Sequence, residues 1–168
     1  EGAEITAYHV GFVLGPCINA SGRLDTATRA LALLCAEKRE EAEKLAGDLY
    51  DLNQSRKAMT EQGKEQAIQS IEENNLGKDR VLVVYLPDCH ESLAGIIAGR
   101  IRELYHKPAF VLTKAENGVK GSGRSIEAYS MYEELVKCSD LLTQFGGHTM
   151  AAGLSMAEEN IERFRKRL

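Results

Sequence analysis

The sequence has 168 residues, enough for one well-buried hydrophobic core or for a small domain with an appendage. Hydrophobic residues make up 43% of it and charged residues 27%, which is typical of a globular chain, and no apolar run is long enough to cross a membrane. The net charge of −4 argues against a protein that coats nucleic acid through a broad basic face, so phosphate binding would need a few well-placed cations.

The N-terminal residues and the cysteines predict a cytoplasmic protein. No basic cluster precedes a hydrophobic run near Glu1, so no signal or transit peptide is expected, and the missing Met suggests that the N-terminus has been cut. The cysteines form no CxxC pair, and no His lies at a spacing that suggests a zinc knuckle, which predicts reduced thiols rather than a zinc site. They are Cys17, Cys35, Cys89 and Cys138.

The segment from Gly11 to Leu34 is predicted to be a loop followed by a short helix. Its Gly-, Pro- and Asn-rich stretch from Gly15 to Arg23 looks too irregular for the interior of a helix or strand. Apolar residues then recur at three- and four-residue steps from Leu24 to Leu34, with Asp25 near the start, which predicts an amphipathic helix. The loop is therefore expected at the N-terminus of this helix.

One long helix is predicted from about Lys38 to Glu73. This stretch has no Pro, consists mostly of strong helix formers, and carries a narrow apolar stripe. Its many charges predict a solvated connector between two bodies, and Gly63 is expected to cost it about 1 kcal/mol relative to Ala. The Asn- and Gly-containing run at residues 74–77 is expected to end the helix.

After Lys78 the pattern changes to alternating short strands and helices, which predicts an α/β layer structure with its own core. The predicted strands cover residues 81–85, 108–113, 118–125 and 151–156, and the predicted helices cover residues 93–104, 129–136 and 158–168. The expected fold class is therefore α/β: a small mixed-sheet domain flanked by helices, preceded by a long connector helix and a short helical tail.

Three glycine-rich segments each carry polar side chains that suit an anion. Glycine allows the backbone close to a ligand, Arg offers a planar fork that matches phosphate oxygens, and Ser adds a hydroxyl donor. A Gly-Ser-Gly stretch is equally typical of a bulge or turn, and a His can cap a turn or a helix instead of binding an anion. The candidate phosphate-binding residues are Arg23, His90, Ser122, Gly123, Arg124, Ser125, Gly146, Gly147 and His148.

Catalytic motifs are missing from the sequence. A two-metal phosphodiesterase needs clustered Asp and His ligands that hold ions about 3.5–4 Å apart, whereas the acids here are dispersed and Asp25, Asp79, Asp88 and Asp140 each stand alone. The sequence also lacks a GxxxxGK[ST] loop and a GxSxG elbow, which argues against the usual NTPases and serine hydrolases. We therefore expect no metal ligands and no catalytic residue in this chain, with His148 the nearest candidate.

Four motifs, in this order, resemble those of the RecJ-type single-strand exonucleases in the DHH phosphoesterase superfamily. Residues 15–24, GPCINASGRL, look like the family motif GPRxNAAGRL, and residues 90–100, HESLAGIIAGR, are similar to HxGVxGIVASR. Residues 121–125 match GSxRS, and residues 146–153 match GGHxxAAG. The resemblance covers nearly the whole chain. Cys17 and Ser92 depart from it, because they replace a usual Arg and a usual Gly.

The resemblance implies three parts. Residues 1–34 would be the C-terminal end of the DHH catalytic domain, residues 35–76 a long connector helix, and residues 77–168 the DHH-associated substrate-binding domain. In the family the two domains face each other across a groove that admits single-stranded but not duplex DNA, and the first domain holds Mn²⁺ or Mg²⁺. The metal ligands would then lie upstream of residue 1. By position, the candidate phosphate contacts include Asn19 besides the residues above, with His148 nearest the scissile bond.

The resemblance implies that the parent protein is a 5′-to-3′ exonuclease of single-stranded DNA in DNA repair and recombination. This chain would supply the substrate-binding wall, and a repair helicase or a single-strand-binding protein would be candidate partners. Two alternatives stay open. One is a DHH-family phosphodiesterase that acts on short RNA, cyclic dinucleotides or nucleoside bisphosphates. The other is a noncatalytic RNA-binding module, like the related domain at the end of alanyl-tRNA synthetase.

Overall fold

A computed structural model describes residues 4–168 and divides the chain into two compact units, Glu1–Met59 and Thr60–Leu168. Helix α3 (Arg39–Glu73) begins in the first unit and ends in the second. It is the long helix predicted from Lys38 to Glu73, and Asn75 follows it in a left-handed conformation with φ 55°. The domain boundaries expected at residues 34 and 76 stay predictions.

The first unit is mostly helical, and the loop predicted from Gly15 to Arg23 is wrong. A π-helix (His9–Leu14) leads into α1 (Gly15–Leu24), and α2 (Ala27–Leu34) follows. Pro16 lies in the first turn of α1, directly after the π-helix. Ser21 is fully buried, and its hydroxyl donates to the carbonyl of Ile18. The polar residues that suggested a loop are thus accommodated within the helix.

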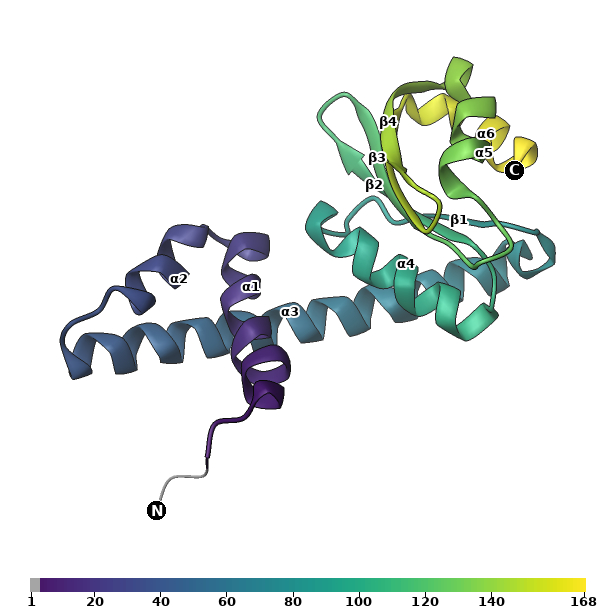
Figure 1. The fold of residues 1–168 in the computed structure, drawn as a ribbon. Helices are drawn as coiled ribbons and strands as arrows, with labels where there is room; N and C mark the ends of the chain where they lie inside the picture. Colours follow the sequence, from purple (N-terminus) through teal and green to yellow (C-terminus); the bar gives the residue numbers. More distant parts are fainter. Residues whose placement is uncertain (1–3) are drawn as a thin grey trace. The chain divides into compact units, whose positions relative to one another are not determined.

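The second unit is built on a five-stranded mixed sheet with the order β1-β2-β3-β5-β4 (Figure 1). Strands β1 and β2 are parallel, and the other neighbours are antiparallel. This arrangement confirms the predicted α/β fold class. The strands are β1 (Leu82–Tyr85), β2 (Ala109–Ala115), β3 (Gly118–Arg124), β4 (Leu142–His148) and β5 (Ala151–Met156).

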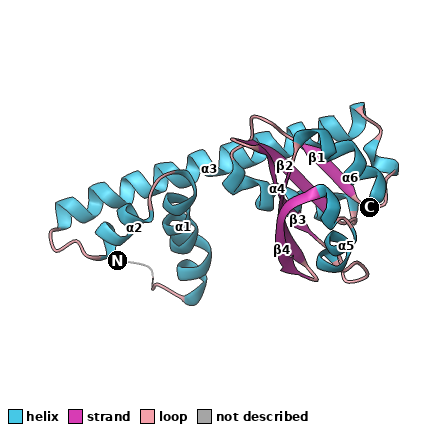
Figure 2. Cartoon of the chain, turned by 90° about the horizontal axis from the view of Figure 1, so that it is seen from above, coloured by secondary structure: helices cyan, strands magenta, loops and turns pink. Residues whose placement is uncertain are grey.

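Helices cover both faces of this sheet, as Figure 2 shows. Helix α4 (Glu91–Tyr105) connects the parallel strands and packs, together with the end of α3, on one face. Helices α5 (Met131–Lys137) and α6 (Ile161–Arg167) pack on the other face. Each face therefore has its own apolar cluster. Short 3₁₀ helices lie at Leu76–Lys78, Ser139–Leu141 and Glu158–Asn160.

Strand β4 (Leu142–His148) is absent from the sequence-based prediction. Two adjacent glycines, Gly146 and Gly147, lower its intrinsic strand propensity, and its register with β5 shifts between Leu142 and Gln144. It lies at the edge of the sheet, beside β5. The hydrogen bonds of that neighbour, rather than a local pattern, make it a strand.

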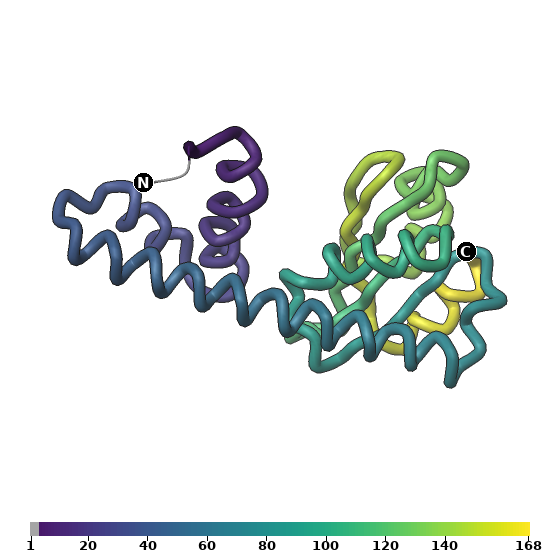
Figure 3. Tube along the Cα trace, turned by 90° about the horizontal axis from the view of Figure 1, so that it is seen from below, coloured from purple at the N-terminus to yellow at the C-terminus, as the bar shows by residue number. Residues whose placement is uncertain are grey.

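Gly63 has a packing role that its helix propensity does not reveal. The end of α3 runs beside α4 (Figure 3), and a Cβ on Gly63 would lie 2.5 Å from Cδ1 of Ile97. A Cβ on Gly47, in the same helix, would meet nothing within 4 Å. The cost predicted for glycine in the helix is therefore offset at Gly63 by the close approach of α4.

Alanine substitutions at these two glycines of α3 should change the free energy of unfolding in opposite directions. Gly63→Ala should lower the free energy of unfolding by about 1–3 kcal/mol, because it overpacks the contact with Ile97. Gly47→Ala should raise it by up to about 1 kcal/mol through helix propensity alone. Urea unfolding followed by circular dichroism measures both. Stabilisation by both substitutions would contradict the packing argument.

Candidate nucleic-acid interface

The motif residues of β3, β4 and β5 fall on one face of the sheet. Residues directly opposite each other in an antiparallel ladder point the same way, and every second residue along a strand shares a face. Three rows of partners cross β3, β5 and β4 in this manner: Lys120–Ser155–Gln144, Ser122–Gly153–Gly146 and Arg124–Ala151–His148. We call these nine residues the polar face. His148 thus lies on the same surface as Ser122 and Arg124, although it is more than twenty residues away in the sequence.

The side chain of Arg124 packs against helix α4. The guanidinium lies against Gly95, where a Cβ would come within 2.6 Å of Nη2, and the Cγ of Arg124 lies 4.0 Å from a Cβ built on Gly99. Nη1 donates to the carbonyl of Gly123 at 2.7 Å. The glycines of the HESLAGIIAGR motif therefore make room for the arginine of the GSGRS motif.

His148 ends β4 and is exposed. Its Nδ1 accepts a hydrogen bond from the backbone N–H of Met150 at 3.3 Å. A neutral imidazole that accepts at Nδ1 carries its proton on Nε2, which can donate to a phosphate oxygen. The two roles considered for His148, closing a turn and binding an anion, use different ring nitrogens and do not exclude each other.

Two predicted site residues of the GSGRS motif are not brought to the polar face. A Cβ on Gly123 would lie 2.4 Å from Sδ of Met131 and 2.5 Å from Cε1 of Phe110, so this glycine faces the core under α5. Ser125 is fully buried, and its hydroxyl donates to the carbonyl of Tyr129. Both residues therefore have packing roles.

His90 lies at the start of α4 and caps that helix. Its Nδ1 accepts from the backbone N–H of Ser92 at 3.3 Å and lies 2.7 Å from the Ser92 hydroxyl. Of the two roles considered for His90, anion binding and helix capping, the geometry matches capping.

Gly147 faces away from the polar face, because it pairs with the core residue Ala152.

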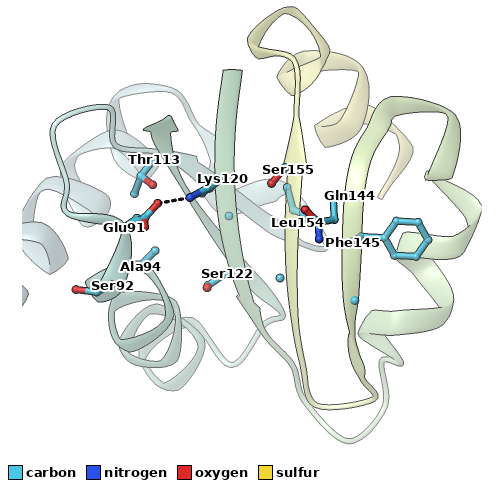
Figure 4. A pocket seen from close by; sticks show the side chains of 13 residues that line it. Glu91, Ser92, Ala94, Thr113, Lys120, Ser122, Gln144, Phe145, Leu154 and Ser155 are labelled. Carbon is cyan, nitrogen blue, oxygen red and sulfur yellow. Dashed lines mark hydrogen bonds and ion pairs between the residues drawn. The ribbon is translucent and has the colours of Figure 1, made fainter. Parts of the chain in front are cut away.

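A cleft of about 420 Å³ opens on the polar face beside the start of α4. Figure 4 shows Ser122, Ser155 and Gln144 along three strands, with the Glu91 carboxylate accepting from Nζ of Lys120 at 2.8 Å. Of these residues, only Ser122 and Glu91 lie in the sequence motifs, and only Ser122 was a candidate site residue. The polar residues at every second position of β3, where Lys120 precedes Ser122 and Arg124, could have indicated Lys120. The other lining residues are Ser92, Ala94, Thr113, Gly121, Phe145, Gly146, Gly153 and Leu154.

Asn19 and Arg23 belong to the first unit. They are four residues apart on α1, so they share one side of that helix, and both are exposed. Cys17 accepts a hydrogen bond from Nδ2 of the buried Asn53 at 3.4 Å, which places it against α3. A surface shared by Arg23 with Arg124 and His148 stays a prediction, because these residues lie in different units.

Residues 4–168 contain no group of three or more His, Cys, Asp or Glu side chains arranged to hold a metal ion. The described residues therefore offer no ligand set for the Mn²⁺ or Mg²⁺ that the motif resemblance implies for the parent protein. All four cysteines are unpaired, and burial raises the pKa of the Cys89 and Cys138 thiols, which keeps them protonated at neutral pH.

Within residues 4–168, every helix is too short or too polar to span a bilayer.

Comparison with known proteins places the second unit in a family. The DHHA1 domain matches residues 78–168. The single-stranded-DNA-specific exonuclease RecJ of Salmonella typhimurium is 38% identical over 172 residues, which cover 98% of this chain and 30% of that protein. The Bacillus subtilis protein of the same name is 38% identical over 161 residues, 95% of this chain and 20% of that protein. The chain thus spans less than a third of these relatives.

Solved structures give the same result. The crystal structure of RecJ in complex with Mg²⁺ from Thermus thermophilus matches with a TM-score of 0.86 and 33% identity over 99% of this chain and 26% of that one. A structure of exonuclease RecJ bound to manganese matches with a TM-score of 0.84 and 34% identity, over 96% of this chain and 40% of that one. Both agree with the α/β fold. The chain therefore belongs to the DHHA1 domain family, within the RecJ group that its motifs predicted.

Proposed function

We propose that this chain is the substrate-binding part of a metal-dependent exonuclease that degrades single-stranded DNA from the 5′ end in DNA repair and recombination. The polar face carries the proposal, because one sheet surface gathers an arginine, a histidine and a serine from two separate motifs. The RecJ relatives, which are named as single-stranded-DNA-specific exonucleases, support the choice of substrate.

The row of Arg124 and His148 is the proposed phosphate clamp. Arg124 offers a planar fork for phosphate oxygens, and Nε2–H of His148 adds a second donor. Ser122 lies one row away, about 7 Å along the strand, where its hydroxyl can reach a neighbouring part of the backbone. Asn19 and Arg23 are proposed as further phosphate contacts from α1, and Gly146 keeps this surface flat.

The catalytic metal is proposed to be Mn²⁺ or Mg²⁺ bound by a part of the protein outside this chain. The metal ions named for the related structures support that proposal. The chain alone should therefore bind DNA without cutting it. In the cytoplasm, a repair helicase or a single-strand-binding protein would supply and hold the DNA strand.

A titration of the chain with 3′-fluorescein-labelled DNA in EDTA tests the proposal. Single-stranded DNA should bind more tightly than duplex DNA, and affinity should fall with salt at a shallow slope, because few cations contact phosphate. Unlabelled RNA and cyclic dinucleotides serve as competitors. Preference for either competitor over single-stranded DNA would contradict the proposal and support a short-RNA or dinucleotide phosphodiesterase. Digestion of the DNA when manganese is added would refute the external metal centre.

A further inference from the structure

The cleft beside α4 contains a buried hydroxyl group that no hydrogen bond satisfies. Thr113 lines this cleft from β2, next to Lys120 in the ladder. Its Oγ1 is buried and has no hydrogen-bond partner among residues 4–168. Buried hydroxyl groups are normally hydrogen-bonded, so an unsatisfied one at a cleft points to a ligand that supplies the partner.

The charges at the cleft favour a neutral ligand over a phosphate. Glu91 and Lys120 form an ion pair at 2.8 Å at its rim, so the charges of these two lining residues cancel. The clamp residues Arg124 and His148 do not line it. A phosphate would therefore bind at the clamp, and the cleft suits a polar group without net charge.

The floor of the cleft is flat. Gly146 and Gly153 are register partners, and a Cβ on Gly146 would meet nothing within 4 Å, whereas one on Gly153 would meet only the Gly121 carbonyl oxygen, at 3.8 Å. Close packing therefore does not require glycine at either position, and a side chain at either would project into the cleft. Gln144 and Ser155 stand at one end of this floor (Figure 4). Their amide and hydroxyl groups both donate and accept hydrogen bonds.

We propose that this cleft is a nucleobase subsite. It takes one base of the DNA strand whose phosphate Arg124 and His148 hold, so the inference rests on the function proposed above. The base lies on the glycine floor, with its polar edge towards Gln144 and Ser155. Gln144 lies two rows from the clamp, roughly 13 Å along the strands. A glutamine amide pairs best with adenine, so adenine is the preferred base. The volume of about 420 Å³ falls in the range of small-molecule sites.

Abasic scanning tests the subsite. The probe is a 5′-phosphorylated octadeoxyadenylate with a 3′-fluorescein, together with versions in which one nucleotide at a time is abasic, titrated with the chain in EDTA. One position should lose affinity by roughly three- to tenfold when its base is removed, the effect of one or two hydrogen bonds. Gln144→Ala should lose a similar factor with the intact probe and should no longer distinguish the abasic probe at that position.

Two further variants make the test specific. Thr143 is an exposed residue next to Gln144 and does not line the cleft, so Thr143→Ala should bind every probe as the unsubstituted chain does. Gly146→Ala, which adds a methyl group to the floor, should act as Gln144→Ala does. Equal affinity for all probes, with binding still sensitive to Arg124→Ala, would overturn the subsite and leave the proposed function intact. If Gln144→Ala lowered the affinity by the same factor for every probe, Gln144 would contact the DNA backbone rather than a base, and the subsite would also be overturned. Failure of the chain to bind the intact probe would instead refute the proposed function.

Discussion

Replacing Arg124 by alanine is expected to weaken the binding of single-stranded DNA roughly thirtyfold, because charge-assisted hydrogen bonds are worth about 2 kcal/mol. The guanidinium is held against Gly95 of α4 and anchored on the Gly123 carbonyl, so it is already oriented before DNA arrives. The slope of log affinity against log salt should also fall by about 0.7, the value for one phosphate contact on a single strand. Fluorescence anisotropy at several salt concentrations measures both effects.

The control for Arg124 is Lys114→Ala, which removes the same charge from an exposed residue of β2. Lys114 follows Thr113, so its side chain points to the opposite face of the sheet. Its loss should change affinity less than twofold, as expected for a distant exposed charge. Equal losses in the two variants would show that only net charge matters. Gly95→Ala should lie between them, since its methyl group displaces the guanidinium and keeps the charge.

Gly147→Ala is expected to destabilise the second unit by about 3 kcal/mol. Gly147 has a φ of +152°, which strains any other residue, and its Cβ would lie 2.3 Å from the Ala151 carbonyl oxygen and 2.5 Å from the Cα of Ala152. Both atoms belong to the backbone of β5 and cannot move aside without breaking the ladder. The chain has six Tyr and no Trp, so tyrosine fluorescence during urea unfolding reports the change.

The adjacent Gly146 is the matched control for stability. A Cβ there meets no atom within 4 Å, so Gly146→Ala should change the free energy of unfolding by no more than about 0.5 kcal/mol. The two glycines of one motif are therefore expected to act differently, Gly147 through the fold and Gly146 through the cleft. If Gly147→Ala proved as stable as Gly146→Ala, the argument from its backbone conformation would fail.

The sequence alone determined the secondary structure wherever the pattern is local. The helix from Lys38 to Glu73 follows from its composition, and the strands of residues 81–85 and 108–113 follow from continuous apolar runs, because helix and strand periods depend on near neighbours. The four ordered motifs likewise predicted the RecJ relationship. Motif order is a property of the chain and needs no coordinates.

Only the tertiary structure decided what distant neighbours impose. Segment 15–24 is helical with Ala20 and Ser21 buried within the first unit, and β4 is a strand because β5 offers it an edge. Which motif residues share a surface depends on strand register, since a shift of one residue would move every side chain of that strand to the opposite face of the sheet. That register sends Ser122 and Arg124 to the polar face and Gly123 to the core. Sequence motifs contain all three residues, but only the pairing of strands separates binding roles from packing roles.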